Sequence, residues 1–334
     1  MDRTSEQKMM EISPITTTLE KESIHLDLPE RQEVKRLAEQ LTETAPGLLD
    51  EPHWLATARD LSCALPVALR TALRNFSADS GQAGAIQIHG LPVGPLPPTP
   101  ARKESVERST TLPASALVLC AMVLGEVVAF EAEKRGALVQ NVVPVPGEEQ
   151  VQSNAGSVDL EMHTENAFHP HRPDFVALFC LRQDLDEEGG LRIASIRRAI
   201  GLLSAEQRRI LAEPRFRTDP PPSFNGSGPT AALGILSGAY EDPDARVDFH
   251  ATTPLDAGAA RAMAALREAL ESVCDTVYFA PGDLAIVDNR VALHGRTAFS
   301  PRYDGHDRWL HRAFIHTDSR RSRAKRNGGG HVIS

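Results

Sequence analysis

The stretch Glu161-Met-His-Thr-Glu-Asn-Ala-Phe-His-Pro170 begins near the end of a segment, Asp159 to His163, that we expect to be a β-strand. Side chains two positions apart on a strand point to the same face of the sheet. His163 and Glu165 would therefore present an imidazole and a carboxylate to one side, where both could bind the same metal ion. A lone His-x-Glu pair is common by chance, so this interpretation depends on further ligands elsewhere in the chain.

A second segment supplies such a ligand. The apolar run that starts at Leu284 is followed by the polar turn Asp288-Asn-Arg290 and then by His294-Gly-Arg296. Two histidines and one carboxylate form the facial triad of non-haem Fe(II) oxygenases, which leaves positions open on the metal for other ligands. The sequence therefore predicts a metal site made by His163, Glu165 and His294.

A third segment, Arg308-Trp-Leu-His-Arg312, places two arginines in an apolar strand. Alternation puts Arg308 and Arg312 on one face. An arginine is always charged and can bind a carboxylate through two parallel hydrogen bonds. Burying two such charges is costly without anionic partners, so we expect carboxylate-bearing ligands beside this strand.

The C-terminal part of the chain, from residue 137 onward, has the pattern of a β-rich domain. Short extended segments with turn signals between them indicate a sandwich or jelly roll with helices at one end. The expected helices are Ser204 to Ala212 and Asp256 to Val273; the expected strands are Ala137 to Val145, Asp159 to His163, Phe175 to Leu181, Leu191 to Ser195, Arg246 to His250, Thr276 to Asp288 and Trp309 to Ile315.

The N-terminal part reads mainly as helices. We expect helices at Pro29 to Leu41, at Leu55 to Phe76 with a break near Pro66, and at Pro113 to Glu133, with a short strand at Gly84 to Gly90. The predicted organisation is a disordered N-terminus over residues 1–25, a single domain over 26–318 with its jelly-roll core at about 137–316, and a flexible basic tail over 319–334.

Composition limits the possible partners. The chain has 36 Lys and Arg residues against 45 Asp and Glu residues, a formal charge of −9, which argues against a general nucleic-acid binder. The most apolar run, Ala114 to Gly125, has 12 residues and is too short to span a bilayer. No apolar signal core is found near the N-terminus. We expect a cytoplasmic protein with a small-molecule substrate and no nucleic-acid or membrane partner; its oligomeric state stays open.

Together, His163-x-Glu165, His294 and Arg308 resemble the iron- and 2-oxoglutarate-dependent oxygenases. The nearer resemblance is to the clavaminate synthase-like branch, which includes arginine and asparagine hydroxylases of antibiotic pathways. The matching stretches cover most of residues 85 to 315 and are Leu91-Pro92, Leu96 to Pro100, Val139 to Val145, His163 to Pro170, Pro281-Gly-Asp283, Asp288-Asn-Arg290 and His294 to Arg312.

This resemblance implies a fold, a set of cofactors and a role for each matching residue. The fold is mainly β with flanking helices around a distorted double-stranded β-helix, or jelly roll; the cofactors are Fe(II), with 2-oxoglutarate and O2 as cosubstrates. The implied roles are metal binding for His163, Glu165 and His294, 2-oxoglutarate binding for Arg308, substrate α-carboxylate binding for Arg312, substrate α-amine binding for Gln140 and Glu165 with help from Ser153, and reading of the substrate side chain for Asp248.

The implied reaction is hydroxylation of an unactivated Cβ or Cγ of a free L-amino acid, with succinate and CO2 as by-products. Asp248 favours arginine, because a guanidinium matches a carboxylate well. His250 stands where arginine-binding relatives tend to have a second acid, so lysine, citrulline, asparagine and glutamine remain open. A family threonine that helps to hold 2-oxoglutarate, expected near Leu191, is absent. Desaturation, ring closure and a non-catalytic jelly-roll binding protein are the remaining alternatives.

Other residues near these motifs have simpler interpretations. His169 and His171 follow the metal motif and are expected to border the pocket or a turn, since three ligands already complete a facial site. His316 is interpreted as a surface residue. The Gly/Ser-rich stretch Ser223 to Pro229 is interpreted as a mobile loop over the pocket.

Overall fold

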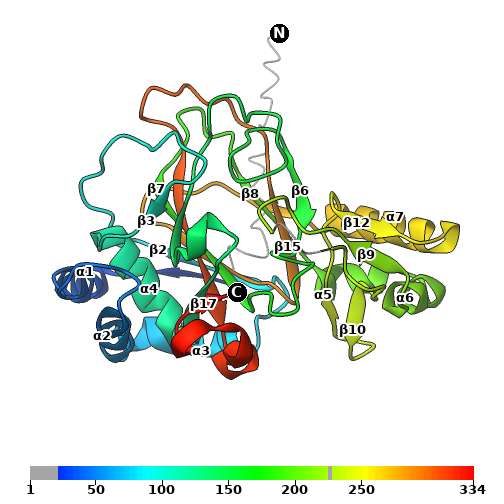
Figure 1. Ribbon diagram of the computed structural model, residues 1–334, viewed down its shortest axis with the longest axis horizontal. Helices are drawn as coiled ribbons and strands as arrows, with labels where there is room; N and C mark the ends of the chain where they lie inside the picture. The colour runs from blue at the N-terminus through cyan, green and yellow to red at the C-terminus, as the bar shows by residue number, and fades with distance from the viewer. Residues whose placement is uncertain (1–21, 225–227) are drawn as a thin grey trace, which may run out of the picture.

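Two β-sheets face each other between two groups of helices in the computed structural model, which describes residues 22–224 and 228–334 (Figure 1). The N-terminal helices lie on one side and the later helices on the other. They are α1 (Leu28–Thr42), α2 (Pro52–Ser62), α3 (Val67–Ala78) and α4 (Leu112–Leu124) on the first side, and α5 (Ile196–Ala199), α6 (Ala205–Ala212) and α7 (Ala257–Ser272) on the second.

The larger sheet has the strand order β1-β2-β14-β7-β16-β4-β17, with β5 paired to β16 and β3 paired to β5. Its strands are β1 (Ser23–His25), β2 (Ala85–His89), β3 (Val106–Glu107), β4 (Glu126–Phe130), β5 (Val139–Val142), β7 (Phe175–Arg182), β14 (Leu284–Asp288), β16 (Trp309–His316) and β17 (Val332–Ile333). Both faces of this sheet are covered: Phe175 and Phe179 of β7 pack with the N-terminal helices, whereas Val176 and Leu178 pack with residues of the smaller sheet. Such burial explains why β7 is apolar at nearly every position.

The smaller sheet has the order β13-β8-β15-β6. Its strands are β13 (Asp275–Val277), β8 (Leu191–Ser195), β15 (Ala292–Arg296) and β6 (Leu160–His163). The outer face packs against α5, α6 and α7, and the inner face turns toward β7, β14 and β16. Short ladders join β9 (Phe216–Thr218) to β12 (Thr252–Pro254) and β10 (Leu236–Gly238) to β11 (Pro243–Ala245). The predicted jelly roll with flanking helices is confirmed.

Helix α4 ends earlier than the sequence suggested. Its residues Pro113 to Leu124 are all buried, which fits a helix that is apolar all round. The prediction of a helix as far as Glu133 is wrong, because the chain turns at Gly125 into β4. A Cβ at Gly125 would lie 2.2 Å from the carbonyl oxygen of His316, so this glycine allows the close approach of the two strands.

Two predicted strands also differ from the structure. The segment Thr276 to Asp288 is two strands in different sheets, β13 and β14, separated by the turn at Gly282. Over Arg246 to His250 the structure has no strand but an isolated bridge between Asp248 and His163, followed by a turn. The predicted break near Pro66 is present between α2 and α3.

Both ends of the described chain join the larger sheet. Ser23–His25, which we expected to be disordered, is strand β1 and pairs with β2; residues 1–21 lie outside the described residues. The C-terminal segment is not a free tail: it forms the 3-10 helices η4 (Ser319–Lys325) and η5 (Asn327–Gly329) and then strand β17 beside β4. Ser322 and Ile333 are buried, so local apolar and polar contacts outweigh the basic composition.

Within residues 22–224 and 228–334 there is no helix with both the length and the apolar character that crossing a bilayer requires. The two remaining short helical turns are η2 (Lys134–Gly136), after β4, and η3 (Ile200–Leu202), after α5.

Candidate active site

Two neighbouring strands of the smaller sheet bring the three predicted metal ligands together. His294 on β15 is paired directly with His163 at the end of β6, and residues opposed in this way have side chains on the same face. Glu165 follows in the next turn. Ligand atoms of His163, Glu165 and His294 all lie within 4.8 Å of one another, so the three side chains could hold a single ion.

Glu165 reaches this cluster by a different route from the one predicted. Strand β6 ends at His163, and Glu165 lies in a turn rather than two positions along the same strand. The next residue, Asn166, has a positive φ of 50°, a conformation that asparagine tolerates better than most residues. The chain therefore turns sharply directly after Glu165, whose carboxylate points into the space between the sheets.

The protonation states of the cluster suit a metal ion. The Nδ1 atom of His163 lies 2.8 Å from the carbonyl oxygen of Glu161. Because a carbonyl can only accept, Nδ1 donates this hydrogen bond, and Nε2 is the ring nitrogen left to bind a metal ion. Burial, followed by the nearby His163, lowers the pKa of His294, which keeps its imidazole neutral. His294 Nδ1 is buried without a hydrogen-bond partner among the described residues, which is consistent with an imidazole that is held by a metal ion.

Burial alone would raise the pKa of Glu165, but the Arg312 guanidinium and the two imidazoles outweigh it, and the pKa is lowered well below its usual range. The Nη1 atom of Arg312 donates to Glu165 Oε2 over 3.0 Å. A neutral imidazole pair and an ionised carboxylate are the forms that bind a divalent cation. The donor set therefore fits Fe(II).

Arg312 is the centre of a buried polar group on the facing sheet. It pairs with Gln140 across β16 and β5, and its Nε donates to Gln140 Oε1 over 3.2 Å. Its guanidinium also contacts Glu133 and lies 4.6 Å from the Phe314 ring centre. With its amide oxygen turned toward the guanidinium, Asn154 accepts from Nη1 over 2.7 Å. The carboxylates that contact Arg312 in this structure are therefore the protein's own Glu133 and Glu165, whereas the sequence predicted carboxylate-bearing ligands beside this strand.

Glu133 and Asn154 were missed in the sequence. Glu133 was assigned to the end of a long helix, whereas it follows β4 and precedes Lys134 and Arg135, which both have positive φ. Burial, and then the repulsion of Glu165 against the attraction of Arg312, leaves the pKa of Glu133 raised. The turn-like composition of residues 133–136 could have shown that the helix ends before Glu133. It could not have shown that Glu133 contacts Arg312, which is 179 positions away.

Arg308 lies just before β16, and its charge has a different environment. It is 5% exposed, and its one hydrogen bond within the described chain runs from Nε to the carbonyl oxygen of Gly189, 3.1 Å away. Its guanidinium lies 5.8 Å from the Phe299 ring centre. Burial lowers the pKa of Arg308. A buried guanidinium that forms no ion pair with a carboxylate of the described residues can bind an anionic ligand.

Of the two remaining residues that the sequence predicted to bind the substrate, Asp248 faces the metal cluster more clearly than Ser153. The bridge between Asp248 and His163 puts their side chains on the same face. Asp248 Oδ1 accepts from the backbone N–H groups of His250 and Ala251, while Oδ2 accepts no hydrogen bond in the described part of the chain. Ser153 Oγ accepts from Ala155 N, and its neighbour Asn154 is the residue that contacts Arg312.

The other histidines lie outside the ligand cluster. His169 packs edge-on against Phe130, and burial, with help from nearby cationic groups, lowers its pKa to about 4. His316, interpreted as a surface residue, is in fact fully buried, with Nε2 3.0 Å from the carbonyl oxygen of His171. Residues 225–227 of the predicted mobile loop lie outside the described residues; Phe224, just before them, packs on Phe168.

A buried cluster of two histidines and one carboxylate between the sheets of a jelly roll defines a mononuclear non-haem iron oxygenase. Comparison with known proteins agrees. The family model described as "Taurine catabolism dioxygenase TauD, TfdA family" matches residues 123–314. L-asparagine oxygenase from Streptomyces coelicolor is 50% identical over 313 residues, which cover 93% of this chain and 94% of that protein. Clavaminate synthase 2 from Streptomyces clavuligerus is 34% identical over 301 residues, which cover 87% of this chain and 91% of that protein.

A solved structure of asparagine oxygenase in complex with Fe(II), 2S,3S-3-hydroxyasparagine and succinate superposes with a TM-score of 0.91 and 49% identity, covering 93% of this chain and 99% of that chain. The chain therefore belongs to the TauD/TfdA family, in its clavaminate synthase-like branch. It is an Fe(II)- and 2-oxoglutarate-dependent oxygenase that hydroxylates a free amino acid, and not a non-catalytic binding protein.

Replacing His294 by alanine should remove one of the three ligands and weaken Fe(II) binding by more than the ~10–100-fold typical of a residue that only supports a ligand. Chelator competition under anaerobic conditions measures the dissociation constant. The control is His169→Ala, which removes an imidazole outside the cluster and should leave that constant unchanged. Equal Fe(II) affinity in the His294 variant and the parent would contradict the ligand assignment.

Replacing Arg308 by alanine should weaken 2-oxoglutarate binding by ~2–5 kcal/mol, because the ligand's carboxylate loses a buried partner. Titration of the Fe(II)-loaded protein with 2-oxoglutarate measures this change. Fe(II) affinity should be unaffected, and Arg308→Lys should restore binding only in part, since lysine lacks the planar fork. An unchanged dissociation constant for 2-oxoglutarate would assign its carboxylate to another residue.

Proposed function

We propose that this enzyme hydroxylates free L-asparagine at C3 in specialised, antibiotic-type metabolism, acting in the cytoplasm. The observation that carries the proposal is the likeness over nearly the whole chain to an asparagine oxygenase whose structure holds 3-hydroxyasparagine. Asparagine was one of the open alternatives from the sequence. We now favour asparagine over arginine as the substrate, and the hydrogen bonds around Asp248 support this choice.

The metal ion is held by His163, Glu165 and His294. Arg308 pairs with the distal carboxylate of 2-oxoglutarate, the one farther from the metal ion. When bound, the iron with 2-oxoglutarate and O2 supplies the oxidant that inserts one oxygen atom into a C–H bond, with succinate and CO2 as by-products. The chain's own contribution is to exclude water and to fix the substrate so that one carbon faces the metal.

Arg312 binds the substrate's α-carboxylate. Arg312 forms ion pairs with Glu165 and Glu133. A zwitterionic substrate brings no net charge with it, and it can pair its carboxylate with Arg312 and its ammonium with Glu133. Gln140 Nε2 is buried without a partner among the described residues and can donate to a substrate oxygen. Asn154 and, next to it, Ser153 complete this side of the pocket.

Asp248 reads the substrate side chain. Its Oδ2 can accept one N–H from a side-chain amide. A guanidinium is held best by two free carboxylate oxygens, but Oδ1 already accepts two backbone N–H groups. Asp248 also disfavours aspartate, because two carboxylates at hydrogen-bond distance repel each other. One acid with one free oxygen thus suits an amide better than a guanidinium or a carboxylate.

A panel of free L-amino acids, with citrulline and ornithine, tests the substrate. Asparagine should gain one oxygen atom by mass spectrometry, with one succinate formed per product. The value of kcat/KM for aspartate and arginine should be at least ~10–100-fold lower, because each leaves a charged group unpaired or repelled. N-acetylasparagine should fail because its amine is blocked. Efficient turnover of arginine or lysine, or loss of two hydrogens instead of gain of oxygen, would contradict the proposal.

The variant Asp248→Asn tests the side-chain reader. It keeps an acceptor oxygen but removes the negative charge, so the preference for asparagine over aspartate should narrow by ~10-fold or more. The control His250→Ala changes the exposed side chain two positions away and should preserve the preference. If aspartate is rejected equally by Asp248→Asn and the parent, another residue reads the side chain.

A further inference from the structure

The turn between β14 and β15 contains a fully buried amide that holds the backbone of Glu165. Asn289 is 0% exposed. Its Oδ1 accepts from Glu165 N over 2.6 Å, and its Nδ2 donates to Glu165 O over 3.0 Å and to Pro173 O over 2.9 Å. Both donors of the amide are used, and its orientation is fixed because only its oxygen can accept from a backbone N–H.

Glu165 depends on this amide because it lies outside every strand. Within the described residues, its backbone N–H and carbonyl form hydrogen bonds with Asn289 alone. The neighbouring Thr164 is tied to Val247, but Glu165 has no ladder partner of its own. Without the amide, two buried backbone groups would be unsatisfied and the turn would open. The direction of the Glu165 carboxylate is therefore set from another part of the chain.

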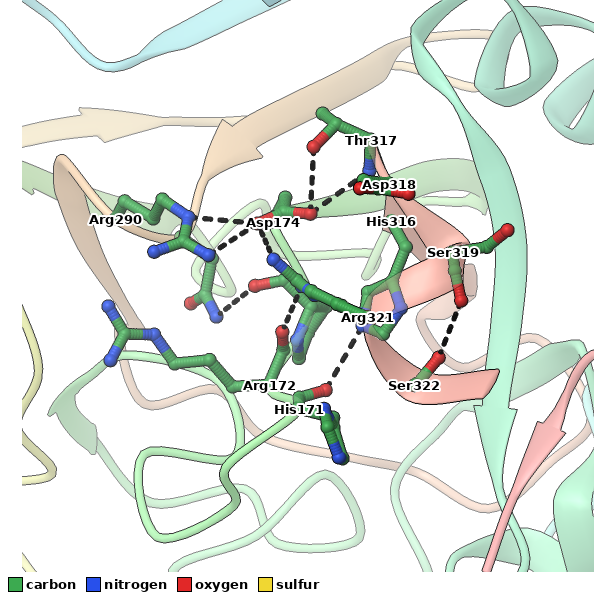
Figure 2. Close-up of polar contacts among 12 residues, drawn as sticks. His171, Arg172, Asp174, Arg290, His316, Thr317, Asp318, Ser319, Arg321 and Ser322 are labelled. Carbon is green, nitrogen blue, oxygen red and sulfur yellow. Dashed lines mark hydrogen bonds and ion pairs between the residues drawn. The ribbon is translucent and has the colours of Figure 1, made fainter. Parts of the chain in front are cut away.

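Asn289 is in turn anchored by Asp174. The backbone N–H of Asn289 donates to Asp174 O over 2.8 Å. The Asp174 carboxylate is almost buried and accepts from Arg290 Nε over 2.8 Å, from Thr317 N over 2.9 Å and from Arg321 Nη1 over 2.7 Å (Figure 2). Asp174 lies just before β7, and these three partners come from the β14–β15 turn, from the residue after β16 and from helix η4.

Arg321 links this network to the C-terminal segment. Besides Asp174, it donates from Nη2 to the carbonyl oxygen of Arg172 over 2.8 Å (Figure 2), so it holds the loop that leads from the Glu165 turn to β7. Its neighbour Arg320 differs: its side chain is 85% exposed and contacts only Asp318 among the described residues. Two adjacent arginines of the same charge thus have different surroundings.

We propose that Asn289 is a positioning residue for the metal ligand Glu165, and that the Asp174–Arg321 pair from the C-terminal segment holds Asn289 and the Arg172 loop in place. The inference rests on the assignment of Glu165 as a ligand in the proposed function. None of the residues Asn289, Asp174 and Arg321 is among those expected to bind the substrate, the metal ion or 2-oxoglutarate. They act through the turn, so their loss should change how well Glu165 is aimed before it changes anything else.

The matched pair Arg321→Ala and Arg320→Ala tests the outer part of the network. Arg321→Ala should raise the Fe(II) dissociation constant by ~10–100-fold, the usual effect of losing a residue that orients a ligand. It should also form more succinate per hydroxylated product, since a misplaced ligand lets 2-oxoglutarate be consumed without substrate oxidation. Arg320→Ala should match the parent in both measurements, and Arg321→Lys should recover part of the loss.

The variant Asn289→Asp tests the inner part. The carboxylate is nearly the same size and still accepts from Glu165 N, but it cannot donate to the carbonyl oxygens of Glu165 and Pro173. Fe(II) affinity should fall at least as much as in Arg321→Ala. Because Asn289 is buried, folding of each variant is checked by melting temperature and circular dichroism. If Asn289→Asp does not fold, Arg321→Ala, altered at a half-buried position, decides the proposal.

Lower melting temperatures with parental Fe(II) affinity and parental succinate-to-product ratio would overturn the inference and leave a purely structural network. That result differs from failure of the proposed function. If His294→Ala keeps its iron, the ligand assignment is wrong; if the parent prefers another amino acid, only the substrate is wrong, and the Fe(II) measurements on Arg321 and Asn289 still stand.

Discussion

The ion pair between Arg312 and Glu165 joins the two sheets of this enzyme. Arg312 belongs to the larger sheet, Glu165 to the turn after a strand of the smaller one, and neither side chain has much access to water. Each charge makes the burial of the other tolerable. The Glu165 carboxylate thus combines two tasks, because it belongs to the metal cluster and also neutralises Arg312. Among the described residues Arg308 has no carboxylate at ion-pair distance and donates only to the carbonyl oxygen of Gly189. The charge of Arg312 is thus paired within the protein, whereas the charge of Arg308 can pair with an anionic ligand.

The ligand triad and the arginine strand could be predicted because their signals are local. His163 and Glu165 are two positions apart, and the alternation of Arg308 and Arg312 is visible in five residues. The fold class followed from the series of short extended segments with turn signals between them, of which those at β7, β8 and β16 are strands in the structure. The strand argument for Glu165 reached the correct neighbour for the wrong reason, since a turn and not a strand directs the side chain.

What could not be predicted depends on contacts between distant segments. Glu133 meets Arg312 only because β4 and β16 are neighbours, and the early end of α4 follows from the approach of Gly125 to His316. The basic residues after Ser319 have the composition of a solvated end, yet Arg321 finds a buried carboxylate 147 positions earlier. Composition describes an average environment, and one specific partner is enough to override it.

Strand β17 pairs in parallel with β4 at the edge of the larger sheet, and the chain reaches this strand only after Arg321. A ribosome makes the turn that carries Glu165 well before Arg321, which lies 147 residues after its partner Asp174. The supports of the turn at Asp174 are therefore incomplete until this later segment has been synthesised and has folded. Folding of the metal centre thus depends on the segment around Arg321 as well as on the sheet that carries His163 and His294.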